Sequence, residues 1–131
     1  MVAARLVGLM LIAACSNKAE SETHVPAQIA PTSVTLENVE RYEEQVRQEL
    51  PIGTPKEAVE AYLRRIAVTH SFVPASAVNP FGNTFNALIE NIGRTAVGPG
   101  LFANANLEIH VHLDDNERVD RIEFNVVVDA P

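Results

Sequence analysis

Two histidines, His110 and His112, are separated by one residue in a segment that alternates apolar and polar side chains. Positions i and i+2 of a β-strand project from the same face, so the two imidazoles are expected side by side. Such a pair could begin a transition-metal site if Glu123 came from a neighbouring strand as a third ligand. The alternative is a polar, solvent-facing side of a sheet whose other side is apolar. The alternation favours this alternative, so we expect no metal or cofactor, and a candidate binding surface at His110, His112 and Glu123.

The other polar groups do not form a recognisable catalytic motif. His70 and Ser71 are adjacent, but a nucleophile needs a base within hydrogen-bond reach and a third group that orients this base. The acidic run Asp114–Glu117 lacks the alternating oxygen ligands and the central glycine of a calcium loop. It is typical of a hairpin turn. We therefore expect no catalytic residue, no enzymatic activity and no small-molecule substrate.

Cys15 is the only cysteine of the chain, and it follows a nine-residue apolar run, Leu6–Ala14. As a helix this run would span about 14 Å, against about 30 Å for a bilayer core. It therefore suits a signal peptide better than a transmembrane anchor. The segment Leu11-Ile12-Ala13-Ala14-Cys15 resembles the lipobox of bacterial lipoproteins, although an ordinary cleavable signal peptide is the alternative. The resemblance implies a signal peptide at residues 1–14, diacylglycerol on Cys15 and, because Ser16 rather than aspartate follows, the outer membrane.

The net charge and the single cysteine exclude several classes of partner and of site. The formal net charge is −7, and an anionic surface repels phosphate backbones, so nucleic acid is not expected as a partner. Attraction to anionic lipid is not expected either, so membrane attachment must come from the lipid on Cys15. A single cysteine also excludes a disulfide within the chain and zinc sites that need several thiolates.

The elements that must position these residues begin after a polar segment with two prolines. Residues 15–33 are interpreted as a lipidated cysteine with a flexible tether, and residues 34–131 as a single domain. Apolar side chains then recur every three or four residues in Leu36–Leu50, which predicts a helix with Thr35 as its N-cap. A second helix is predicted at Pro55–Ala67, where Thr54 and Glu57 have the spacing of a capping box.

The C-terminal part has the pattern of strands. Leu107–Leu113 and Ile122–Val128 alternate apolar and polar residues around the acidic turn and predict a β-hairpin. Thr84–Asn91 fits either a strand or a short helix, and a strand is favoured. Thr69–Gly82 and Gly93–Asn106 contain turn-forming prolines and glycines and are expected to be loops. The predicted fold is α+β, with two helices packed on one face of a roughly three-stranded antiparallel sheet.

The segment Ile52-Gly53-Thr54-Pro55-Lys56-Glu57-Ala58-Val59, followed by Tyr62-Leu63, resembles SmpA/OmlA-type outer-membrane lipoproteins. The hairpin at residues 107–124 is similar to the closing hairpin of that group. The resemblance implies two helices on a three-stranded antiparallel sheet, a fold shared with β-lactamase-inhibitor-type proteins. It also implies a role in outer-membrane assembly or maintenance.

These patterns together favour a non-enzymatic, membrane-tethered protein-binding module at the periplasmic face of the outer membrane, with an envelope protein as its partner. Binding is expected at the sheet face around His110, His112 and Glu123, or at the two expected loops. The alternative is an inhibitor or immunity-type protein that blocks a periplasmic enzyme, because acidic protruding loops suit basic active-site clefts.

Overall fold

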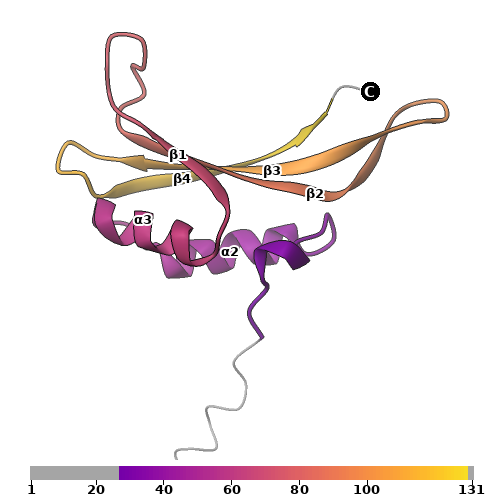
Figure 1. Cartoon of the computed structure of the whole chain (residues 1–131), viewed down its shortest axis with the longest axis horizontal. Helices are drawn as coiled ribbons and strands as arrows, with labels where there is room; N and C mark the ends of the chain where they lie inside the picture. Colours follow the sequence, from indigo (N-terminus) through magenta and orange to yellow (C-terminus); the bar gives the residue numbers. More distant parts are fainter. Residues whose placement is uncertain (1–26, 130–131) are drawn as a thin grey trace, which may run out of the picture.

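The computed structural model describes residues 27–129 and has two layers (Figure 1). An antiparallel sheet of four strands, in the order β1-β2-β3-β4, lies on two helices. The predicted α+β class is confirmed, but the expected three strands are too few. The elements are η2 (Pro31–Ser33), α2 (Val39–Glu49), α3 (Lys56–Arg65), β1 (Thr69–Val73), β2 (Thr84–Gly98), β3 (Leu101–Leu113) and β4 (Val119–Val128).

The predicted signal peptide and Cys15 lie outside the described residues, as does most of the predicted tether. The last part of that tether, 27–33, packs against α2. Ile29 is buried, its backbone N–H donates to Gln45 Oε1 at 2.8 Å, and its carbonyl accepts from Gln45 Nε2 at 2.9 Å. The folded unit therefore includes residues before position 34. No helix within residues 27–129 combines the length and the apolar character needed to cross a membrane.

Both helices form where the apolar stripes were predicted, but their starts differ in detail. The expected N-cap at Thr35 is wrong, because Asn38 occupies the N-cap position of α2. Thr35 and Asn38 instead bond reciprocally in the turn before the helix: Thr35 N–H donates to Asn38 Oδ1 at 2.7 Å, and Asn38 N–H donates to Thr35 Oγ1 at 3.3 Å. The expected capping box at Thr54 is wrong, because its hydroxyl donates to the Pro51 carbonyl at 2.6 Å instead. Pro55 occupies the N-cap position of α3.

The core lies between the helices and one face of the sheet. Tyr42 and Val46 of α2 and Val59 and Leu63 of α3 are almost completely buried. They share one cluster with residues that alternate along the strands, namely Phe85, Leu107, Ile109 and Val111. Because successive strand residues point to opposite faces, burial of these positions assigns the intervening residues of β2 and β3 to the other side of the sheet.

The two expected loops were largely wrong, because both contain strand. Residues 69–73 form β1, which pairs with β2 from Thr69↔Leu88 to Val73↔Thr84. Residues 93–106 belong to the long β2–β3 hairpin, whose turn is only Pro99–Gly100. Pairs such as Arg94↔Asn104 and Thr95↔Ala103 supply backbone hydrogen bonds that compensate for weak local strand preference. The favoured strand interpretation of Thr84–Asn91 is confirmed.

Candidate functional site

One face of the sheet carries no helix among residues 27–129, and we call it the open face (Figure 1). On β3 it carries Glu108, His110 and His112, which alternate with the buried core residues. Strand register continues this face in rows. Ser71, Asn86, His110 and Glu123 form one row across the four strands, and Val73, Thr84, His112 and Arg121 form the next. The shared face expected for the two histidines is therefore present.

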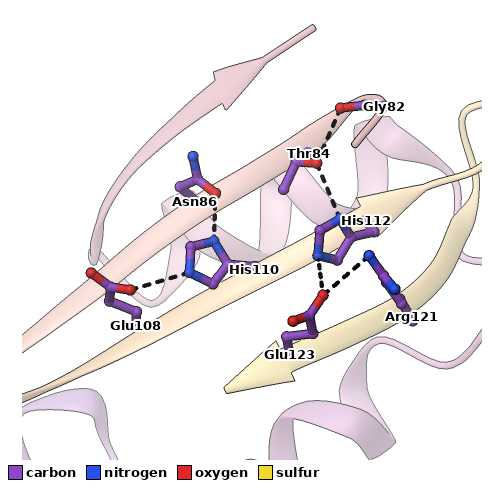
Figure 2. Close-up of polar contacts among 8 residues, drawn as sticks. All are labelled: Gly82, Thr84, Asn86, Glu108, His110, His112, Arg121 and Glu123. Carbon is purple, nitrogen blue, oxygen red and sulfur yellow. Dashed lines mark hydrogen bonds and ion pairs between the residues drawn. The ribbon is translucent and has the colours of Figure 1, made fainter. Parts of the chain in front are cut away.

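His110 is held by neighbours on two strands (Figure 2). Its Nδ1 donates to Asn86 Oδ1 on β2 at 2.7 Å, and its Nε2 lies 3.3 Å from Glu108 Oε2. The side chain keeps 28% of its surface exposed. Its ring is thus fixed in orientation while one side remains accessible to a binding partner.

His112 has a different environment, although it lies two residues away. It is buried and bonds through Nδ1 to Thr84 Oγ1 at 3.2 Å. Its Nε2 lies 2.7 Å from Glu123 Oε1, and this contact is an ion pair only while the imidazole is protonated. Burial lowers the pKa of His112 below its ordinary value, Arg121 lowers it further, and Glu123 opposes the shift. The folded protein therefore favours neutral His112.

Glu123 joins the two rows. In the strand register it lies opposite His110, yet its carboxylate contacts His112 and also Arg121 Nη2, at 3.2 Å (Figure 2). The expectation that Glu123 lies beside the histidines on a neighbouring strand is confirmed. The Glu123 carboxylate is thus held in place by the charged guanidinium of Arg121 and by the imidazole of His112.

A shallow hollow of about 300 Å³ lies on the open face beside His110. Polar and apolar side chains of β1, β2 and β3 surround it, including Thr69, Ser71, Asn86, Leu88, Glu108 and His110. The hollow is open, so it would hold a side chain of a partner more readily than it would enclose a free small molecule.

The same geometry separates the residues that catalysis would need together. His70 pairs with Ala87, which in turn pairs with the core residue Ile109, so His70 belongs to a row on the helix side of the sheet. Its Nδ1 donates to the Val68 carbonyl at 2.9 Å. Ser71 lies on the open face. Within residues 27–129, no three His, Cys, Asp or Glu side chains are placed to hold a metal ion.

The acidic segment forms the β3–β4 turn, as predicted. Asp114 Oδ1 accepts from Asn116 N–H at 2.9 Å and from Arg118 N–H at 3.0 Å. Glu117 lies 3.6 Å from Lys56 Nζ. These carboxylates are thus occupied in closing the hairpin and joining it to α3.

Several residues of the open face were missed from the sequence. Thr84, Asn86 and Glu108 hold the two histidines, and the alternation of Thr84-Phe85-Asn86-Ala87 was a signal for them. Apolar side chains also flank the polar centre. Val78 and Phe81 are exposed on the β1–β2 loop, which extends on the side away from the helices (Figure 1). Phe102 is 56% exposed, lies under Arg94, and continues the open face along the β2–β3 hairpin.

Comparison with known proteins finds no matching family model and no significantly similar curated protein or solved structure.

Proposed function

We propose that this chain is a non-enzymatic lipoprotein of the periplasmic face of the outer membrane, whose open face binds another envelope protein. The observation that carries the proposal is the combination of a helix-free sheet face with a fixed polar network on it. His110, His112 and Glu123 are each held by at least one side chain of a neighbouring strand. Groups that are already oriented lose little conformational entropy when a partner binds.

The apolar flanks support the same proposal. Phe81 is 73% exposed on one side of the network and Phe102 is 56% exposed on the other. Exposed aromatic side chains are enriched among the residues that dominate binding energy in protein interfaces. A polar centre between two such side chains matches a protein partner better than a membrane or a small molecule.

The anchor part of the proposal rests on the lipobox-like segment that ends at Cys15. Two or more acyl chains hold a protein stably at a membrane, whereas one is marginal. The first described residues, from Ala27, lie on the helix side of the molecule (Figure 1). A tether on that side would leave the open face directed away from the bilayer.

The test is photocrosslinking in native envelopes with a crosslinking amino acid introduced at Ser71, beside the hollow. A second substitution, His110→Ala, removes the central imidazole, and Arg64→Ala on α3 is the matched control because its side chain is 70% exposed on the other layer. We expect at least about a tenfold loss of crosslinked partner with His110→Ala and none with Arg64→Ala. Equal crosslinking in both variants, with unchanged circular dichroism, contradicts binding at the open face.

A second candidate function is inhibition of a periplasmic enzyme, which the β1–β2 loop favours. This loop protrudes from the sheet and carries Val78, 94% exposed, beside Phe81 (Figure 1). A protruding loop with an exposed aromatic side chain suits insertion into an enzyme cleft. In that case the crosslinked partner is an enzyme, its activity falls on addition of the purified chain, and Phe81→Ala abolishes the inhibition while His110→Ala leaves it unchanged.

A further inference from the structure

Strand β4 lies at an edge of the sheet, and its outer side is occupied only at its start. There Val119 N–H donates to the Thr54 carbonyl, and Gly53 N–H donates to the Val119 carbonyl, both at 2.8 Å. Among residues 27–129, no backbone hydrogen bond closes the outer edge of β4 beyond this point. Free N–H and C=O groups along an edge strand are a template for pairing with another chain.

The helix side of β4 is apolar up to its end. Ile122, Phe124, Val126 and Val128 are in register with the core residues Val111, Ile109, Leu107 and Ala105. The helices cover the first two, whereas Val126 and Val128 remain 45% and 43% exposed. An uncovered apolar strip beside an unpaired edge is the combination that natural monomers avoid.

Charged side chains that could block pairing with another strand are found on only one half of β4. Asp120, Arg121 and Glu123 lie in the first half, while Asn125-Val126-Val127-Val128 carries no charge at all. Charged side chains are a usual means of blocking edge pairing. Without charged side chains, the second half of β4 is open to pairing with another strand.

We propose that β4 pairs antiparallel with β4 of a second copy of this chain, about a two-fold axis at Asn125. In this register Phe124 lies opposite Val126 of the second copy, and Ile122 lies opposite Val128. All four apolar residues then face apolar residues on the same side of a continuous eight-stranded sheet. A symmetric pair uses the same patch on both subunits, so each contact occurs twice.

Charge complementarity between the two strands favours an axis at Asn125 over axes at the neighbouring residues. With the axis at Asn125, Arg121 lies opposite Asp129 of the second copy, and opposite charges across strands are favourable. Both side chains are exposed. Within one copy Arg121 contacts Glu123 at 3.2 Å and Asp129 Oδ1 accepts from Asn106 Nδ2 at 2.9 Å, which leaves Asp129 Oδ2 for the second copy. With the axis at Glu123, two carboxylates lie face to face. With the axis at Val126, Glu123 meets Asp129, and with the axis at Phe124 no opposite charges meet.

The two-fold axis is normal to the sheet, which decides where the rest of each copy lies. Both helix layers fall on the same side, and so do both N-terminal segments, which emerge from the helix layer (Figure 1). Two tethers on one side are compatible with anchoring in one bilayer, although the dimer does not depend on the proposed function. Both open faces point the other way and form one surface with two histidine networks.

The first test exchanges the charges. The full chain is purified in detergent micelles, and its dimer dissociation constant is measured by analytical ultracentrifugation. We expect Arg121→Asp and Asp129→Arg each to weaken the dimer at least about tenfold. The combined variant, Arg121→Asp with Asp129→Arg, restores it to within about threefold of the wild type. A wild-type chain that stays monomeric, or a combined variant as weak as the single ones, overturns the proposal.

The second test fixes the register. Two residues directly opposite each other across an antiparallel pair are within the Cα separation of a disulfide, about 4.4–6.8 Å. Asn125→Cys is therefore expected to form a disulfide between two copies through position 125 on mild oxidation, identified by peptide mass spectrometry. The matched control is Asn116→Cys, which is exposed in the β3–β4 turn. A 125–125 linkage no more abundant than the 116–116 linkage contradicts the register, whatever the outcome of the crosslinking at Ser71.

Discussion

Two histidines of the same strand face have opposite roles because their surroundings differ. The side chain of His110 is 28% exposed beside the hollow, while that of His112 is 11% exposed between Thr84 and Glu123. Desolvation disfavours a charged imidazole. His112 therefore links β2, β3 and β4, and His110 is the histidine that we propose contacts the partner.

The buried histidine makes stability depend on pH. Because the pKa of His112 is lowered in the folded protein, the unfolded chain binds this proton more readily, and acidification favours unfolding. His112 thus contributes a loss of stability as the pH falls from about 7.5 to about 5.5, through the ordinary pKa of histidine. In His112→Gln the free energy of unfolding, measured by urea denaturation at each pH, should fall less over this interval. Identical pH profiles for variant and wild type contradict the assignment.

At the scale of elements, the reciprocal bonds between Thr35 and Asn38 begin α2. Asn38 is the N-cap residue of α2, and the two bonds close the turn that leads into the helix. The turn between these two residues also links the N-terminal segment to the sheet, because Leu36 N–H donates to the Ile92 carbonyl at 2.9 Å. The start of α2 is therefore held both by its own side chains and by the β2–β3 hairpin.

Thr35→Ala should lower the free energy of unfolding by about 1 kcal/mol, because it removes one hydrogen bond from the turn that leads into α2. The measurement is urea denaturation followed by circular dichroism. Thr32→Ala is the matched control, because Thr32 is exposed and lies in the preceding 3-10 helix. Equal effects of the two substitutions would show that the Thr35 hydroxyl does not stabilise the turn before α2.

At the scale of the whole molecule, stability depends on the layer between the helices and the sheet. Leu107 is completely buried in this layer, and Leu101 lies on the same face of the same strand but is 53% exposed. Leu107→Ala should cost about 2–5 kcal/mol, since it removes buried methyl groups and leaves a cavity. Leu101→Ala should cost well under about 1 kcal/mol. Thermal and urea unfolding of both variants measure the difference, and similar costs would contradict the placement of the core.

Attachment to the membrane is also a property of the whole chain. If Cys15 carries the lipid, Cys15→Ser should move the protein from the membrane fraction to the soluble fraction or leave an unprocessed precursor. Ser16→Ala keeps the cysteine and should remain in the membrane fraction. Fractionation followed by mass spectrometry of the N-terminus gives the answer. Retention of a processed Cys15→Ser chain in washed membranes, or a wild-type N-terminus without the mass of the lipid, would refute lipid anchoring through this residue.

Much of this fold could be predicted from local pattern, because helices and hairpins are made by neighbours in sequence. The stripe at Val39, Tyr42 and Val46 and the alternation at Leu107–Leu113 each identify one element and its buried face. The acidic turn between β3 and β4 and the short connection between the two helices could be predicted for the same reason. The shared face of His110 and His112 needed nothing more than the two-residue period of a strand.

Only the tertiary structure decided which distant segments pair. Residues 69–82 and 93–106 contain prolines and glycines that locally favour loops. Residues 69–73 nevertheless become a strand because β2 offers them a partner edge, and residues 93–98 and 101–106 become strands because they pair with each other. The neighbours of the histidines follow from that same pairing, since Asn86 and Thr84 reach them only through the β2–β3 register. Periodicity sets the face on which a side chain lies, but burial, pKa and free edges depend on contacts between residues far apart in the chain.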